Sequence, residues 1–312
     1  MSFGIEFLNC PDLFPARRAG EPWGDHHVTI DFLGGPYLFS GLHRAQVEAV
    51  RNHFGPYHVE EDASPRRSVE IRLYRAGESD FRKFDLKGWE YRLDFDYHSH
   101  AVRVAGLEFM GLLEWQPDLA GAVWTSTLDP DRFCEVFENL LRVTAQYHVL
   151  ELGGLLVHSA ALVIDDAAYL FPGRSGAGKS TLSRLAAARH WQILSDELNA
   201  LSVREATTYV QQVPFAGDFG RTERSNTSFP LAGIFSLRQA ADAIEPLSTS
   251  QTLAVMLSCS PFVNLDPHRS ERAQSVLEGI VSRQVAHTLN FSLAGKLAAL
   301  DRFTSKARVA TV

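Results

Sequence analysis

The sequence feature that most constrains this chain is a glycine-rich segment near its middle. Residues 173–181 read Gly-Arg-Ser-Gly-Ala-Gly-Lys-Ser-Thr and fit the pattern G-x-x-x-x-G-K-[ST]. An apolar, strand-like run, Ala168–Phe171, precedes the segment, and Thr181–Arg189 follows it with apolar residues at helical spacing. Because the pattern requires a strand, a glycine loop and a helix in this order, the sequence predicts a phosphate-binding loop (P-loop) rather than an ordinary glycine-rich turn.

Each part of the predicted P-loop has a chemical role. Its glycines allow a tight turn in which successive backbone N–H groups converge on an anion at the positive end of a helix. Lys179 is expected to reach the β- and γ-phosphates of a nucleotide, and the hydroxyl of Ser180 is expected to bind Mg²⁺. The predicted nucleotide-binding residues are Gly173, Arg174, Ser175, Gly176, Ala177, Gly178, Lys179, Ser180 and Thr181.

An acidic pair, Asp196 and Glu197, follows the short predicted strand Trp191–Leu194. In open α/β sheets, ligands bind at the carboxyl ends of strands, beside the phosphate loop. One carboxylate at this position can hold Mg²⁺, directly or through water. A second can orient or deprotonate an attacking hydroxyl group. The alternative interpretation is a pair of solvated turn residues without a function.

Two further residues are candidates for catalysis. His158 lies within the apolar strand Leu155–Ile164, where it is either a buried core residue or a catalytic group. Arg221 ends the segment Pro214–Arg221, which contains glycine and aromatic residues. This segment is either a substrate loop that directs Arg221 at a transferring phosphoryl group or an ordinary polar loop.

Composition excludes several other classes of protein. The 312 residues are 45% hydrophobic and 21% charged, which is typical of a globular protein, and the net charge is −7. This charge argues against binding to nucleic acid or to a membrane surface. Three widely separated cysteines give no zinc-binding spacing, and Glu6 and Asp12 do not fit a signal peptide. We therefore expect a cytoplasmic protein.

The chain divides into two predicted domains. Residues 1–128 contain alternating segments, such as Val69–Tyr74, and predict a mainly β (α+β) N-terminal module with antiparallel sheets and a possible role in substrate recognition. Residues 129–312 predict an α/β domain that contains the P-loop. A linking helix over residues 129–150 belongs to this second domain, with Asp129 as its cap and Pro130 at its first position.

Residues 150–200 resemble the C-terminal catalytic domain of HPr kinase/phosphorylase and its relatives. That family has a histidine on a strand shortly before a G-x-x-G-x-G-K-[ST] loop, matched here by His158 and by Gly173–Ser180. It also has an acidic pair after the following helix, matched by Asp196 and Glu197. The whole chain looks closer to HPr-kinase-related proteins found beside peptide-modification genes, which include lasso-peptide precursor kinases.

The resemblance implies both a fold and roles for these residues. The fold would be a P-loop nucleotide-binding domain of the HPr kinase/phosphoenolpyruvate carboxykinase type, preceded by the mainly β module. Asp196 would deprotonate the accepting hydroxyl group, and His158 would lie near the phosphates. Glu197 would assist Ser180 in binding Mg²⁺.

Three functions are compatible with these residues. The first is a serine kinase that uses ATP and Mg²⁺ to phosphorylate a small protein or peptide, mainly by positioning the reactants and neutralising charge. The second is a kinase that acts on a hydroxyl group of a small molecule. The third is a regulator that binds a nucleotide without transferring phosphate. A homo-oligomer is an open alternative to a monomer in all three.

Overall fold

The computed structural model describes residues 20–60, 68–77, 93–115, 117–220, 222–223 and 227–311. Contacts within the chain divide it into two compact units, Met1–His148 and Val149–Val312. The sequence instead placed the boundary between residues 128 and 129. The difference concerns helix α3 (Pro130–Glu151), most of which falls in the first unit. The reason is its apolar face, because Phe137 packs against both Phe39 and Phe54 of that unit.

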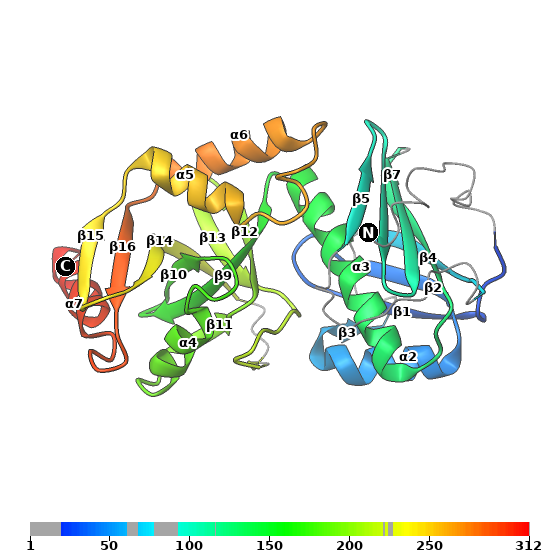
Figure 1. Ribbon diagram of the computed structural model, residues 1–312, viewed down its shortest axis with the longest axis horizontal. Helices are drawn as coiled ribbons and strands as arrows, with labels where there is room; N and C mark the ends of the chain where they lie inside the picture. Colours follow the sequence, from blue (N-terminus) through cyan, green and yellow to red (C-terminus); the bar gives the residue numbers. More distant parts are fainter. Residues whose placement is uncertain are drawn as a thin grey trace. The chain divides into compact units, whose positions relative to one another are not determined.

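The first unit contains one mixed sheet, drawn in blue to green in Figure 1. Its strands are β1 (His26–Ile30), β2 (Tyr37–Leu42), β3 (His58–Val59), β4 (Val69–Arg75), β5 (Asp94–Tyr97), β6 (Ala101–Gly106), β7 (Phe109–Trp115) and β8 (Leu119–Thr125). They lie in the order β3-β1-β2-β4-β8-β7-β6-β5. The prediction of an antiparallel sheet was wrong in its centre, because β2, β4 and β8 run parallel. Alternation reports which face is buried and not the direction of a neighbouring strand.

Two helices pack on one face of this sheet. Helix α2 (Arg44–Phe54) begins with a capping box formed by His43 and Gln46, and the short 3₁₀ helix η2 (Gly55–Tyr57) follows it. Helix α3 begins at the predicted cap, where Asp129 Oδ1 accepts a hydrogen bond from the Arg132 N–H at 3.0 Å. These helices complete the hydrophobic core of the first unit, and the predicted P-loop belongs to the second unit.

The second unit contains a second sheet, in which each of the two longest strands pairs with different neighbours along its two halves. Its strands are β9 (Leu155–Ile164), β10 (Ala167–Pro172), β11 (Gln192–Ser195), β12 (Leu198–Arg204), β13 (Thr207–Gln212), β14 (Ser228–Gln239), β15 (Ala243–Pro246) and β16 (Ala286–Phe291). The first half of β9 pairs with β12 and its second half with β10 and β11. Strand β14 pairs with β13 and then with β10 and β16.

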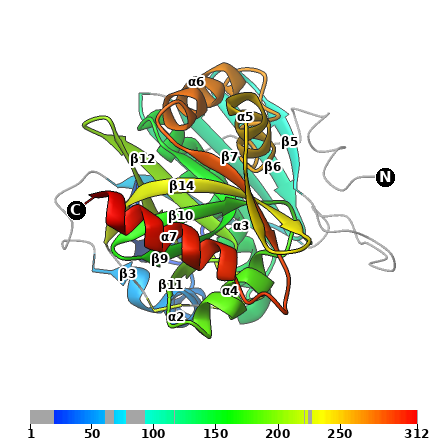
Figure 2. The ribbon, with the colours of Figure 1, turned by 90° about the vertical axis from the view of Figure 1, so that its left-hand side faces the viewer.

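Helices cover both faces of the second sheet (Figure 2). They are α4 (Lys179–Ala187), α5 (Thr249–Ser258), α6 (Ser270–Val281) and α7 (Ala298–Thr311). Leu182 of α4 and Leu300 of α7 share a buried cluster with Phe171 and Phe235 of the strands. Helices α5 and α6 lie on the opposite side of the sheet, as both ribbon views show. Helix α7 was not predicted.

Parallel strands bring three chain segments to one edge of this sheet. Strand β14 runs parallel to β10 on one side and to β16 on the other. The carboxyl ends of these three strands are Pro172, Gln239 and Phe291, so they lie at the same edge. This edge is the position at which open α/β sheets bind ligands.

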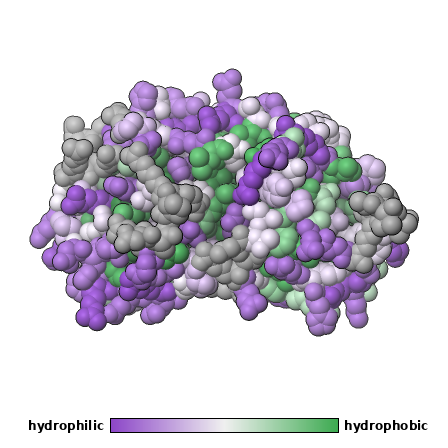
Figure 3. Space-filling view, turned by 180° about the vertical axis from the view of Figure 1, so that it is seen from behind, coloured by the Kyte–Doolittle hydropathy of each residue, from purple (hydrophilic) through white to green (hydrophobic). Residues whose placement is uncertain are grey.

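The face shown in Figure 3 is mainly hydrophilic, with smaller apolar patches among the hydrophilic residues. Within the described part of the chain, no helix is both long enough and apolar enough to cross a membrane.

Candidate functional site

The predicted P-loop connects β10 to α4, in the structural context that its pattern requires. A hairpin leads into it, because Asp165 and Asp166 both have positive φ angles, 54° and 59°, as a tight two-residue turn needs. Gly178 caps α4 with φ at 100°, and a Cβ atom there would lie 2.9 Å from Cζ of Phe291. Glycine at this position is therefore required both by conformation and by space. The backbone N–H groups of the first turn of α4 have no acceptor within the helix and are suited to an anion.

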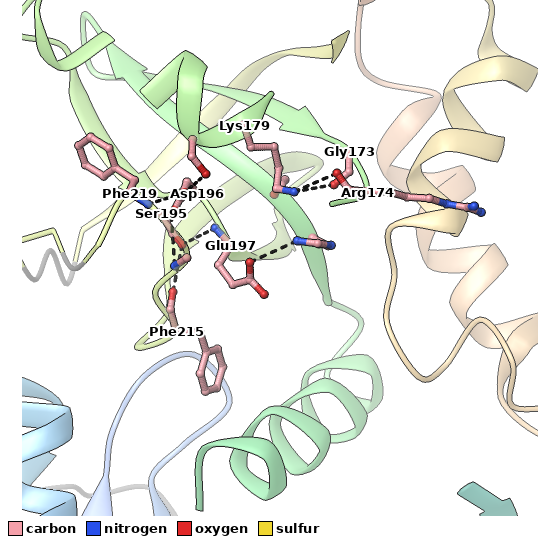
Figure 4. Close-up of polar contacts among 12 residues, drawn as sticks. Gly173, Arg174, Lys179, Ser195, Asp196, Glu197, Phe215 and Phe219 are labelled. Atoms are coloured by element: carbon pink, nitrogen blue, oxygen red, sulfur yellow. Dashed lines mark hydrogen bonds and ion pairs between the residues drawn. The ribbon is translucent and has the colours of Figure 1, made fainter. Parts of the chain in front are cut away.

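Lys179 begins α4 and is buried, with 6% of its surface exposed. Its Nζ donates hydrogen bonds to the carbonyl oxygens of Gly173 at 2.9 Å and of Arg174 at 3.3 Å. Figure 4 shows the side chain turned toward these carbonyls. Burial lowers the pKa of the Lys179 ammonium, and the negative charge of Glu197 is the largest opposing influence. A bound polyphosphate would add negative charge beside this buried cation.

Asp196 lies in the two-residue break between β11 and β12, both of which pair with β9. The carboxylate is 2% exposed, and its Oδ2 accepts a hydrogen bond from Ser180 Oγ at 2.6 Å. The break has a defined shape because Ser195 Oγ accepts the Glu197 N–H at 3.0 Å and donates to the carbonyl of Phe215 at 3.1 Å. The P-loop hydroxyl and the buried carboxylate are thus in direct contact.

The segment after β13 packs against Asp196 through Gly217 and Phe219. The backbone N–H groups of Gly217 and Phe219 donate to the two carboxylate oxygens at 3.2 Å and 3.0 Å, and Phe219 lies beside Asp196 in Figure 4. A Cβ atom on Gly217 would lie 2.7 Å from Oδ1 of Asp196, so only glycine allows this approach. Thr222 Oγ1 also donates to the carbonyl of Leu194 at 2.8 Å. The part of the predicted substrate loop that the structure describes is therefore tied to the acidic site.

Glu197 and His158 form the second half of the acidic site. Glu197 Oε2 lies 3.3 Å from His158 Nε2, and both side chains are about one quarter exposed. The backbone of His158 is fixed, because its N–H donates to the carbonyl of Cys259, just after α5, at 2.7 Å. His158 is therefore a partly exposed residue that faces an acid rather than a fully buried core residue.

These side chains line one cavity of about 410 Å³ in the second unit. Its lining residues are His158, Ser175, Gly176, Gly178, Lys179, Ser180, Thr181, Arg184, Asp196, Glu197, Asp218 and Gln239. The predicted P-loop contributes backbone N–H groups and an ammonium of the kind that bind phosphate, and the acidic residues contribute oxygen atoms of the kind that Mg²⁺ prefers. The arrangement is chemically suited to a phosphorylated ligand and a divalent cation.

The structure brings most of the predicted site residues together. The P-loop residues, His158, Asp196 and Glu197 all surround this cavity or contact its lining. Arg221 lies outside the described residues. Sequence reasoning missed Arg184, Asp218 and Gln239, which also line the cavity. None of the three belongs to a local sequence pattern, and Gln239 reaches the cavity because β14 pairs with β10 in parallel.

Comparison with known proteins adds two similarities. The family model described as SynChlorMet cassette protein ScmC matches residues 131–282, just under half of the chain. Among solved structures, the chain is similar to the Hpr(Ser) kinase/phosphatase from Coxiella burnetii, with 13% sequence identity and a TM-score of 0.32. That similarity covers 50% of this chain and 97% of the other. No curated protein matches the sequence.

Proposed function

We propose that this chain is a kinase that uses ATP and Mg²⁺ to phosphorylate a hydroxyl group, with serine of a small protein or peptide as the acceptor. The observation that supports it best is the 2.6 Å contact between Ser180 Oγ and Asp196 in the cavity that Lys179 also lines. A nucleotide-binding loop needs the lysine and the serine. A kinase also needs a carboxylate that can accept a proton from the attacking hydroxyl group.

The residues fit both ligands of the proposed reaction. Ser180 presents a hydroxyl oxygen that donates to Asp196, and Glu197 adds a partly exposed carboxylate to the same cavity, so Ser180 and Glu197 are the proposed Mg²⁺ ligands. Oxygen atoms of this kind are the usual protein ligands of Mg²⁺, which when bound would neutralise charge on the phosphates. The first turn of α4 and the Lys179 ammonium would bind the phosphate oxygens.

The side chains of the cavity would act in sequence. Lys179 would exchange its hydrogen bonds to two backbone carbonyls for bonds to phosphate oxygens. Asp196 would accept the proton of the acceptor hydroxyl as the new P–O bond forms and the bond to the leaving ADP breaks. His158, beside Glu197, would support the orientation of that carboxylate. Catalysis would come mainly from positioning and from charge stabilisation.

The acceptor is the part of the proposal that rests on resemblance. HPr kinases and their peptide-modifying relatives phosphorylate serine, and the residues matched to them here are His158, Asp196 and Glu197. A small-molecule acceptor would use the same three residues. An experiment with an undefined mixture of acceptors therefore tests the proposal more sharply than an assay with one chosen substrate.

The test uses ATP labelled at the γ-phosphate, Mg²⁺, the purified chain and fractions of an extract from the source cells. Asp196→Asn is the matched control, because it preserves size while removing the basic carboxylate. We expect label in a protein or peptide fraction with the wild type and a loss of about 10²- to 10⁴-fold with the variant. The variant should still bind ATP.

The other outcomes separate the alternatives. Label confined to small metabolites would support a small-molecule kinase. Nucleotide binding without any transfer would support a regulator. Full transfer by Asp196→Asn would exclude this carboxylate as the base.

A further inference from the structure

The P-loop edge of the second sheet has two chemically different sides. On one side, the cavity carries the carboxylates of Asp196, Glu197 and Asp218. On the other side, Gln239 and Phe291 end the parallel strands β14 and β16. Both residues touch the P-loop, because a Cβ atom on Gly178 would lie 2.9 Å from Cζ of Phe291 and 3.6 Å from Nε2 of Gln239.

The direction of the nucleotide follows from the proposed function. The γ-phosphoryl group must face Asp196, since the acceptor hydroxyl approaches it there. The α-phosphate and the nucleoside must then extend away from the acidic side. The remaining direction along the P-loop leads past Gly178, which lies beside Gln239 and Phe291 at the ends of β14 and β16.

Two loops form a fixed surface in that direction. Asp242, just before β15, accepts hydrogen bonds through Oδ1 from the N–H of Ser292 at 3.0 Å and from its hydroxyl at 3.2 Å. Gly295 packs closely on the same carboxylate, with no space for a Cβ atom. The loop after β16 is therefore held against the turn after β14. Within it, the Leu293 side chain remains 69% exposed.

Gln239 supplies the polar part of this surface. It lines the cavity and is exposed, and no hydrogen bond within the described part of the chain occupies its side-chain amide. A glutamine amide presents a donor and an acceptor together and can pair with the edge of adenine. Leu293 offers an exposed apolar side chain two residues beyond Phe291. Ligand pockets typically combine an apolar surface with a few placed polar groups of this kind.

We propose that Gln239 and the loop Ser292–Gly295 form the nucleoside subsite, in which the Gln239 amide binds the adenine edge and Leu293 packs on the base. This proposal rests on the proposed nucleotide site, and it assigns the specificity for a nucleotide, as opposed to a bare polyphosphate, to residues outside the P-loop pattern. Variants of Gln239 or Leu293 should therefore weaken ATP binding without affecting phosphate binding.

The test compares binding of ATP and of inorganic tripolyphosphate to the full-length chain by calorimetric titration with Mg²⁺. Gln239→Ala and Leu293→Ser should each weaken ATP binding by about tenfold while binding tripolyphosphate as the wild type does. Lys179→Ala should weaken the binding of both ligands. Matched controls are Gln274→Ala on α6 and Leu265→Ser, which is 72% exposed; both lie outside the cavity lining and should leave both affinities unchanged.

The following results would overturn either the nucleoside subsite or the proposed function. Wild-type ATP affinity in both variants, or an equal loss of affinity for both ligands, would overturn the nucleoside subsite while leaving the nucleotide site intact. Wild-type protein that binds tripolyphosphate as tightly as ATP would also overturn it, because no binding energy would then come from the nucleoside. Wild-type protein that binds neither ligand would reject the proposed function itself.

Discussion

At the scale of the residue, the site combines a buried cation with a buried carboxylate whose two oxygen atoms both accept hydrogen bonds. Asp196 accepts hydrogen bonds from Ser180, Gly217 and Phe219. Buried polar groups are stable only when they are paired, so these donors account for a carboxylate that is 2% exposed. Substituting the groups that hold Asp196 should therefore affect chemistry more than nucleotide binding.

Gly217→Ala tests this separation. Its methyl group would lie 2.7 Å from Oδ1 of Asp196, so the carboxylate or the loop must move. We expect phosphoryl transfer to fall by about 10²-fold, as a misplacement of about 1 Å can cause, with ATP affinity within about threefold of the wild type. Gly279→Ala is the control, because the nearest atom to its Cβ is 3.8 Å away on the flexible Arg283 side chain. Equal transfer by Gly217→Ala and the wild type would contradict this positioning role.

The lowered pKa of Lys179 should make nucleotide binding depend on pH. Its pKa is lowered from the ordinary 10.5 by burial, so the free protein releases this proton at a lower pH than an exposed lysine does. A bound polyphosphate favours the charged ammonium and raises the pKa again. ATP affinity should therefore fall as the pH rises through the lowered pKa, and ATP binding in that range should take up protons.

Calorimetric titrations in buffers of different ionisation enthalpy measure this uptake. The control is Lys179→Arg, because a guanidinium keeps its charge throughout the range. In that variant the pH dependence and the proton uptake should both disappear. Proton uptake that persists unchanged in Lys179→Arg would assign it to another group.

At the scale of the element, the strands that flank the P-loop are held by an aromatic cluster. His287 of β16 stacks on Phe235 of β14, with ring centroids 5.4 Å apart, and contacts Phe303 of α7 at 4.8 Å. Burial lowers the pKa of His287 below its ordinary 6.5, because the neutral ring suits this apolar setting. The cluster thus joins the two strands whose carboxyl ends reach the P-loop.

His287 should make the stability of the second unit depend on pH. The unfolded chain binds the proton more readily than the folded chain, so the free energy of unfolding should decrease as the pH falls through about 6.5. Urea denaturation at about pH 5 and about pH 8 measures the difference, and His287→Phe should reduce it. An unchanged difference in that variant would show that another group causes it.

Elements whose sequence pattern lies within a few neighbouring residues could be predicted from the sequence, whereas features that depend on contacts between distant segments could not. The hairpin of β9 and β10, the P-loop and α4 follow from Asp165-Asp166 and the glycine pattern, which are short-range features. The parallel centre of the first sheet depends on which distant strands meet, and alternation does not encode this. The boundary within α3 likewise depends on partners of Phe137 that lie far away in the sequence.

At the scale of the whole molecule, the proposed chemistry belongs to the second unit alone. The residues of the P-loop cavity all fall within Val149–Val312. Sequence motifs identified the half of the cavity that holds Lys179, Ser180 and Asp196, because these residues lie close together along the chain. They did not identify Gln239, which reaches the cavity only because β14 pairs with β10 in parallel. A site assembled by sheet topology leaves no local pattern in the sequence.

The measurement that tests the central claim most directly is the binding of ATP to the full-length chain with and without Mg²⁺. We expect saturable binding that Mg²⁺ strengthens. Ser180→Ala should lose most of this gain while still binding ATP, because its hydroxyl lies beside Asp196 where the cation would bind. Lys179→Ala should bind ATP at least tenfold more weakly, which corresponds to a loss of about 1.4 kcal/mol or more of binding free energy. No saturable binding by the wild type, or wild-type affinity in Lys179→Ala, would contradict the claim that this cavity binds a nucleotide.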